Sequence, residues 1–480
     1  MKEIAAIRSL LAIICLLHTV PAFSGTHAVD GDRPNILIIL ADDLGWGDLG
    51  CYGNDQVVTP HLDRLAREGM RFTQAYAPAP ICSPSRAAIL TGRSPARLNF
   101  EFVTKPDGSP VPAGTRLQQP SFPRDLPLEE ITLSEIIDST YRTGYFGKWH
   151  LTQENDHYLG WGEKLGPLQQ GFEIGSENRG SHPYSYTAQE KKTFGEWKQG
   201  EYPPDALTQE AIGFLNSEKD QPFLLYYSMY YVHSPVRTRC RWLFEKYKSL
   251  LGAGATEKQI HYAAFLETMD AYIGQLLQAL ESTGQSENTL VIFLSDNGGH
   301  PGFRGNAPLR GSKWNLYEGG IRVPMMVRWP EMIQPGSICQ VPVTGVDVFP
   351  TVCALTGSQP PEGMTLDGVD LSPLFISGAT SHTGDTASPT SDALSLRNLY
   401  WHFPFYHPDF VDTRPQSAIR AGKYKLIYHY ETRRVELFDL DKDPGETNDL
   451  SKRLPVHARK LEKELMDYLQ KVQARIPKEI

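Results

Sequence analysis

Acidic and amide side chains follow two apolar segments of this chain. Asp42 and Asp43 come directly after one segment, and Asp296 and Asn297 come just after the other. Oxygen ligands of this kind suit a hard cation such as Ca²⁺ or Mg²⁺, although acids in such positions also cap helices. Two clusters together favour a metal site, and the sequence has no His-Glu-x-x-His or Cys-x-x-Cys motif to indicate zinc.

A cysteine opens the segment Cys-Ser-Pro-Ser-Arg-Ala-Ala-Ile-Leu-Thr-Gly-Arg at positions 82–93. Pro84 and Ser85 are typical of a helix start, so Cys82 is predicted to lie at a helix N-terminus, where backbone N–H groups and the dipole favour an anion. Arg86 adds a guanidinium that suits a tetrahedral oxyanion. A thiol phosphatase would need arginine six positions after the cysteine, but Ala88 stands there.

Apolar segments that end at polar residues are predicted to be strands buried on both faces of a sheet. They end just before Asp42, Lys148, His233 and Asp296. Strands that alternate with helices indicate an α/β fold, whose ligands bind beyond the carboxyl ends of the strands. The four polar clusters are therefore expected to form one site. The predicted strands are residues 35–40, 144–146, 223–231 and 289–294, and the predicted helices include 132–141 and 262–281.

The N-terminus is typical of an export signal. Lys2 and Arg8 flank an apolar run that is too short to span a membrane, and small residues around position 24 allow cleavage. We therefore expect a signal peptide at 1–24, no membrane span, and a periplasmic or secreted protein. The formal net charge of −9 gives no general attraction for nucleic acid.

Two domains are expected after the signal peptide. The first is a catalytic domain at 33–376, and a segment rich in Ser, Thr and Gly separates it from a C-terminal subdomain at 393–480. Five cysteines would remain in the exported chain, an odd number that singles out Cys82. The other four could form two disulfides or stay buried thiols. They are Cys51, Cys240, Cys339 and Cys353.

Cys-x-Pro-x-Arg followed by Ala-x-x-Leu-Thr-Gly-Arg resembles the signature of the type I, formylglycine-dependent sulfatases, an arylsulfatase-like family of the alkaline phosphatase superfamily. Thr152 and Ser312 replace glycines that are common in that family. The resemblance implies a mixed, mainly parallel sheet between helices, with a smaller α+β subdomain of antiparallel sheet and terminal helix. Further matching segments are 34–47, 147–151, 233–235, 295–299, 309–313, 317–324, 437–440 and 443–446.

The resemblance also implies a mechanism. A maturation enzyme would oxidise Cys82 to formylglycine (3-oxoalanine), whose hydrated gem-diol attacks sulfur, forms an enzyme-bound sulfate ester, and then expels sulfate. Arg86 would orient the diol, Lys148 and Lys313 would bind sulfate oxygens, His150 would act as base, and His233 with Lys313 would protonate the leaving alcohol. One Ca²⁺ would be held by Asp42, Asp43, Cys82, Asp296 and Asn297.

The predicted activity is release of inorganic sulfate from a sulfated saccharide. The segment at 400–404 resembles a group of bacterial sulfatases that act on sulfated galactose or N-acetylgalactosamine, and this resemblance implies such a substrate. Asn297 favours a one-metal sulfatase, since a two-zinc phosphatase of the superfamily would have histidine there. The alternatives are a phosphodiester or phosphonate monoester hydrolase that shares the oxidised cysteine, and a non-catalytic sulfated-glycan binding protein. Residues that could line the substrate pocket, or simply its rim, are His300, Arg304, Arg310, Trp401 and His402.

Overall fold

The computed structural model describes most of the chain after the predicted signal peptide. That peptide, the linker at 377–392 and Arg304 lie outside the described residues. The described residues are 33–104, 111–137, 139–153, 159–217, 221–303, 306–376, 394, 396–407 and 413–480.

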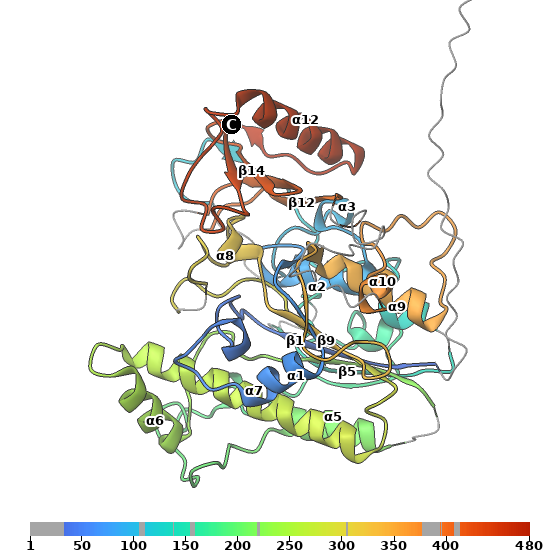
Figure 1. Cartoon of the computed structure of the whole chain (residues 1–480), viewed down its shortest axis with the longest axis vertical. Coiled ribbons are helices and arrows are strands. Elements are labelled where there is room, and N and C mark those ends of the chain that lie inside the picture. Colours follow the sequence, from blue (N-terminus) through green and yellow to red (C-terminus); the bar gives the residue numbers. More distant parts are fainter. Residues whose placement is uncertain are drawn as a thin grey trace, which may run out of the picture.

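A mixed, mainly parallel sheet of eight strands forms the centre of the molecule (Figure 1). Among the described strands of this sheet, β9 alone runs antiparallel to its neighbours. The four predicted apolar strands are adjacent in it, which confirms the α/β fold. In spatial order the strands are β10 (Ser337–Cys339), β2 (Met70–Phe72), β9 (Met325–Arg328), β8 (Thr289–Ser295), β1 (Asn35–Ala41), β7 (Phe223–Ser228), β5 (Arg142–Gly147) and β6 (Ile174–Ser176).

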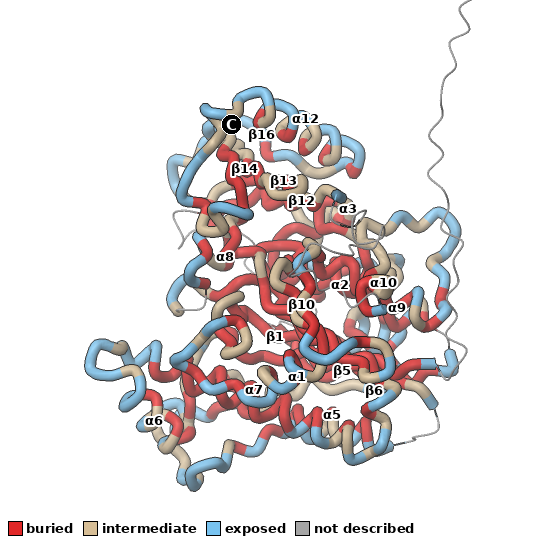
Figure 2. The backbone as a smooth tube through the Cα atoms, viewed as in Figure 1, coloured by how far each residue is buried: buried red, intermediate tan, exposed pale blue. Residues whose placement is uncertain are grey.

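Helices cover both faces of the sheet, and their apolar side chains give the two largest buried clusters of the core (Figures 1 and 2). One face carries α1 (Pro60–Glu68), α5 (Ala206–Asn216), α6 (Arg241–Leu251) and α7 (Glu257–Ser282). The other face carries α2 (Cys82–Thr91), α4 (Leu133–Ile136), α9 (Val348–Thr356) and α10 (Ser372–Ile376). Smaller elements are η1 (Gly50–Tyr52), α3 (Pro95–Leu98), η3 (Pro167–Gln169), η4 (Pro183–Ser185), η5 (Gly345–Asp347), α8 (Glu318–Ile321) and the strand pairs β3 (Ala75–Tyr76) with β11 (Val343–Thr344) and β4 (Leu117–Gln118) with β16 (Lys478–Glu479).

Two predicted elements are shorter than their sequence patterns suggest. The helix expected at 132–141 ends after one turn, because Ile137 is extended and the chain then enters β5. The strand expected at 223–231 ends at Ser228. The chain then bends around the end of β1, where Asp42 N donates to Tyr231 O and Val232 N donates to Asp42 O.

A second, antiparallel sheet of four strands forms the C-terminal part, as the resemblance implies. Side chains alternate between its faces: Ile419, Leu426 and Leu437 pack against α12, while Ala418 and Ile427 face the rest of the molecule. Among the described residues, no helix combines the length and apolar character needed to cross a membrane. These elements are β12 (Asn398–Phe403), β13 (Gln416–Ala421), β14 (Tyr424–His429), β15 (Arg434–Asp439) and α12 (Pro455–Lys471).

Candidate active site

The carboxyl ends of two neighbouring parallel strands bring the predicted acidic clusters together. Ala41 at the end of β1 pairs with Ser295 at the end of β8, so Asp42, Asp43 and Asp296 follow at the same edge. Asp43 N donates to Asp296 Oδ1 at 3.2 Å. The φ of Asp43 is +63°, a left-handed conformation that costs a non-glycine residue free energy and is often found at functional sites.

Cys82 is the first residue of α2, as its sequence context predicts. Its Sγ lies 3.5 Å from Asp42 Oδ1 and 3.8 Å from Asp43 Oδ1, and Lys313 Nζ donates to it at 3.2 Å. Burial raises the pKa of this thiol, more than the nearby lysines lower it. The unmodified side chain therefore stays protonated and is a weak nucleophile. All five described cysteines are free thiols, so the predicted alternative of two disulfides is not realised.

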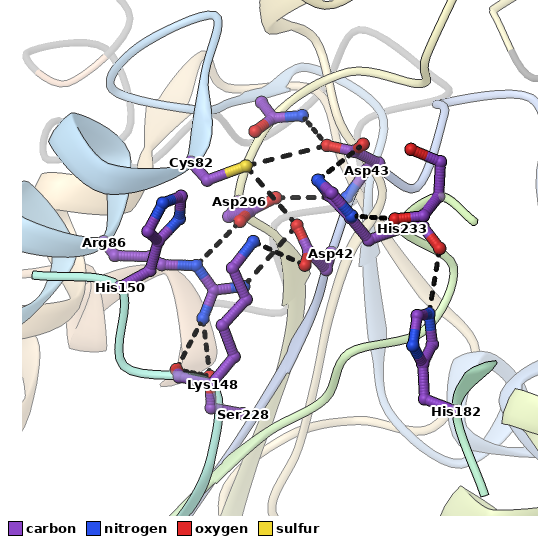
Figure 3. Close-up of polar contacts among 12 residues, drawn as sticks. Asp42, Asp43, Cys82, Arg86, Lys148, His150, His182, Ser228, His233 and Asp296 are labelled. Atoms are coloured by element: carbon purple, nitrogen blue, oxygen red, sulfur yellow. Dashed lines mark hydrogen bonds and ion pairs between the residues drawn. The ribbon is translucent and has the colours of Figure 1, made fainter. Parts of the chain in front are cut away.

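Three buried cations face the carboxylates, and Figure 3 shows Arg86 and Lys148 among them. Lys148 Nζ donates to Asp42 Oδ2 at 2.6 Å, and Lys313 Nζ donates to Asp43 Oδ1 at 2.5 Å. Arg86 Nε donates to Asp296 Oδ2 at 2.8 Å and Nη1 donates to the Lys148 carbonyl at 2.9 Å, while Nη2 lies 3.8 Å from Asp42 Oδ1. Each cation of the cluster is therefore paired with a carboxylate, and these pairs lie around the Cys82 sulfur.

Burial and neighbouring charges shift the pKa values of Asp43 and Asp296 in opposite directions. Burial disfavours ionisation of Asp43, but Lys313, His233 and Lys148 outweigh it and hold its pKa below the usual range. Burial and the charge of Asp42 raise the pKa of Asp296 to about 6, although Arg86 opposes them. A bound cation would relieve this crowding of negative charge.

The donor set fits a hard cation. Asp43 Oδ2 and Asn297 Oδ1 are buried acceptors to which none of the described residues donates a hydrogen bond. Ligand atoms of Asp42, Asp43, Cys82 and His233 lie within 4.8 Å of one another. Carboxylate and amide oxygens are the ligands that Ca²⁺ takes in proteins, and a buried acceptor without a donor is expensive unless something satisfies it.

Two histidines border the cluster, and their backbone contacts fix their tautomers. His150 Nε2 lies 3.0 Å from the Thr104 carbonyl, and His233 Nδ1 lies 2.6 Å from the Ser234 carbonyl. Because a carbonyl only accepts, each of these nitrogens carries the hydrogen. The basic atoms are therefore His150 Nδ1 and His233 Nε2, the latter 3.8 Å from Asp43 Oδ2. Burial lowers the pKa of both rings well below the usual value.

The fold and this cluster agree with comparisons to known proteins. A family model described as "Sulfatase" matches residues 34–358, and one described as "N-sulphoglucosamine sulphohydrolase, C-terminal" matches residues 312–475. The chain belongs to the sulfatase family. It is 34% identical over 476 residues to arylsulfatase A of Homo sapiens (87% of this chain and 83% of the relative). It is 31% identical over 453 residues to N-acetylgalactosamine-6-sulfatase of Canis lupus familiaris (87% and 82%).

Solved structures agree with this assignment. The sulfatase matches the crystal structure of Ps i-CgsB in complex with k-i-k-neocarrahexaose with a TM-score of 0.71 and 28% sequence identity, over 91% of this chain and 93% of that chain. The protein is therefore an enzyme that hydrolyses sulfate esters, as the sequence motifs predict.

The residues predicted to contact substrate are only partly brought to this site. His300 lies close to it: Gly299, just before it, accepts a hydrogen bond from Lys313 N at 3.0 Å. Arg310 instead stacks on Tyr317, with its Cζ 3.8 Å from the ring centroid, and donates to the Glu446 carbonyl.

The structure differs most from prediction at Trp401 and His402. Trp401 is buried and donates through Nε1 to the Ala77 carbonyl at 2.8 Å. His402 is also buried, with its ring nitrogens on Ser417 Oγ and the Arg475 carbonyl. Both side chains are thus buried and hydrogen-bonded within the protein, which favours a packing role for them over a direct contact with substrate.

Sequence reasoning missed two residues that support the site. Ser228 Oγ accepts from Arg86 Nη1 at 2.6 Å and donates to the Lys148 carbonyl at 2.6 Å. Its position as a small hydroxyl residue inside the apolar and aromatic run predicted as a strand at 223–231 was a usable signal. Tyr184 Oη contacts His233 Nδ1 at 2.9 Å and donates to the Ser234 carbonyl at 2.7 Å. Tyr184 lies in the one-turn helix η4, and the sequence around it carries no such signal.

Proposed function

We propose that this sulfatase releases sulfate from a sulfated carbohydrate, with Cys82 converted to formylglycine. The observation that carries the proposal is the position of Cys82, a buried thiol of raised pKa between two carboxylates and a lysine at a helix N-terminus. A relative named N-acetylgalactosamine-6-sulfatase and the match to a complex with k-i-k-neocarrahexaose support a saccharide substrate.

Two groups would complete the site. A maturation enzyme would convert Cys82 to an aldehyde, whose hydrate supplies one hydroxyl to attack sulfur and a second to expel sulfate. One Ca²⁺ would be held by oxygens of Asp42, Asp43, Asp296 and Asn297 together with residue 82, and when bound it would neutralise sulfate charge. The buried acceptors on Asp43 and Asn297 support this ligand set.

The chain's own cations would bind and orient the sulfate group. The ammonium groups of Lys148 and Lys313 lie beside Asp42, Asp43 and Cys82 and would stabilise the charge that moves onto the oxygens in the transition state. Arg86, held by Asp296 and the Lys148 carbonyl, would fix residue 82 and the lysine backbone in one geometry.

The two histidines would move protons. His150 is neutral at pH 7 because burial and nearby cations lower its pKa, so its Nδ1 would accept the proton of residue 82 when sulfate leaves. His233 Nε2, with Lys313, would donate a proton to the leaving alcohol. The negative charge of the bound sulfate ester would favour the protonated ring that this step requires.

Export and domain organisation belong to the same proposal. The signal peptide at 1–24 would be removed, and residues 33–376 and 393–480 would form the catalytic domain and the C-terminal subdomain. Exposure to external polysaccharide would then follow from secretion or periplasmic location.

The test is sulfate release from defined galactose, N-acetylgalactosamine and glucosamine sulfates, with Cys82→Ala as the matched control. We expect the wild type alone to act, peptide mass spectrometry to find the aldehyde at residue 82, and elemental analysis to find one Ca²⁺ per chain. Hydrolysis of phosphodiesters in preference to sulfates would instead favour the alternative that the protein is a phosphodiester or phosphonate monoester hydrolase. If protein that carries the aldehyde binds these saccharides but does not hydrolyse them, the alternative of a non-catalytic sulfated-glycan binding protein is favoured.

A further inference from the structure

A lysine at the start of α7 has no anionic partner in the described part of the chain. Lys258 is exposed and lies in the first turn of the helix, where the dipole disfavours a cation. No carboxylate of a described residue lies within ion-pair distance of its Nζ. Glu257, beside it in the chain, faces His261 instead.

Aromatic contacts hold this ammonium in place. Lys258 Nζ lies 4.6 Å from the centroid of the Phe303 ring. A Cβ built on Gly302 would lie 2.2 Å from the same nitrogen, so the ammonium lies directly against the backbone of this turn. The face of an aromatic ring attracts a cation but, unlike a carboxylate, carries no net charge that would neutralise it.

The aromatic support is tied to the active-site loops. Phe303 stacks on Tyr262, with ring centroids 4.5 Å apart and planes at 5°. Tyr262 Oη donates to Asp48 Oδ2 at 2.5 Å, and the same oxygen accepts from Gly45 N, two residues after Asp43. The position of Lys258 is therefore fixed relative to the acidic cluster.

The segment that contacts Lys258 starts at the catalytic cluster. A Cβ on Gly299 would lie 3.2 Å from Gly45 Cα, and His300 follows directly. Burial lowers the pKa of His300 to about 4, and the charges of Asp43, Lys313 and Lys258 all act on it. Since α7 leads into β8, its N-terminus lies at the edge of the sheet where the strands end at the site (Figure 1).

We propose that Lys258, supported by Phe303 and Tyr262, binds a second anionic group of the saccharide, beside the sulfate that is cleaved. This inference rests on the proposed function. A chain of net charge −9 repels polyanions at long range, so an exposed lysine against the turn that contains His300 and Gly302 gives local attraction. The second group is an oxyanion, either the carboxylate of a uronic acid or another sulfate.

The experiment compares three monosulfated disaccharides that differ only in the neighbouring sugar: neutral, uronate-bearing, or carrying a second sulfate. We expect Lys258→Gln to lower the kcat/KM ratio of the anionic to the neutral disaccharide about fivefold at low ionic strength, mainly through KM. Lys258→Arg should restore most of the ratio. Lys452→Gln, at another exposed lysine before α12, is the matched control and should keep it.

Binding in a Cys82→Ala background separates this inference from the proposed function. Calorimetry there should show weaker affinity for an anionic disaccharide when Lys258→Gln is added, whether or not the wild type turns that saccharide over. The disaccharide whose affinity falls in the variant, uronate-bearing or doubly sulfated, identifies the second anionic group that Lys258 binds. An unchanged kcat/KM ratio or affinity, or an equal loss in Lys452→Gln, would overturn the subsite, whereas absence of sulfate release by the wild type would count against the proposed function alone.

Discussion

At the scale of single residues, Arg86 shows how one side chain connects three parts of the site. Its guanidinium binds Asp296 after β8, the Lys148 carbonyl after β5 and Ser228 at the end of β7. Lysine would keep the charge but has one ammonium in place of a planar fork, so it cannot hold all three. We therefore expect Arg86→Lys to lower kcat/KM for sulfate-ester hydrolysis by about 100-fold or more.

The control for that change is in the same sequence motif. Arg93 forms a half-buried ion pair with Glu130, outside the acidic cluster. Arg93→Lys should therefore leave sulfate release nearly as it is in the wild type, as measured by steady-state kinetics on one aryl sulfate. An equal loss of kcat/KM in both variants would mean that the motif acts by stabilising α2 rather than through the hydrogen bonds of the Arg86 guanidinium.

At the scale of elements, a buried carboxyl on α7 anchors the start of α1. Asp270 accepts from His61 N at 3.1 Å and from Leu62 N at 2.8 Å. Burial raises its pKa from 3.8 to about 7, so between these values the folded state binds the proton more tightly than the unfolded state. Its contribution to stability is therefore complete below about pH 4 and declines as pH rises toward 7.

Asp270→Asn removes this titration. The variant should be less stable than the wild type at pH 5, because Asn has one acceptor oxygen for two N–H groups. The difference in free energy of unfolding should then shrink by about 2 kcal/mol between pH 5 and 7. Denaturant unfolding at several pH values measures it, and a difference that grows with pH would show that the carboxylate form is the one stabilised.

The elements also show what could be predicted from the sequence. The ends of β1 and β8 were predictable because each apolar run stops at the acids that form the site. The early end of β7 was not, because it depends on hydrogen bonds between Asp42 and the 229–232 segment, which are distant in sequence. The burial of Trp401 was not predictable for a similar reason, because it comes from packing of β12 against Tyr76 of β3, which is distant in sequence.

At the scale of the whole molecule, buried charges join the C-terminal sheet to the catalytic part. Lys425 Nζ on β14 lies 2.9 Å from both Glu318 Oε1 and Glu446 Oε1, and all three side chains are fully buried. Glu318 is five residues after Lys313. Glu446 also accepts from Glu318 N at 2.7 Å. The C-terminal sheet therefore supports the segment that delivers Lys313 to Cys82.

Removing the shared cation should destabilise the molecule strongly. Lys425→Met keeps much of the side-chain volume but removes the cation that Glu318 and Glu446 share. Glu318 keeps its ion pair with Arg322 at 3.4 Å, whereas Glu446 loses the ion pair with Lys425, and breaking such a buried pair costs about 3–5 kcal/mol of unfolding free energy. Lys423→Met, in the same hairpin, removes only a partly exposed lysine from Asp439 and should change stability little. Urea unfolding of both variants tests this. Equal stability of the two would mean that Glu318 and Glu446 take up protons at little cost, and that contacts other than this ion-pair cluster hold the C-terminal sheet in place.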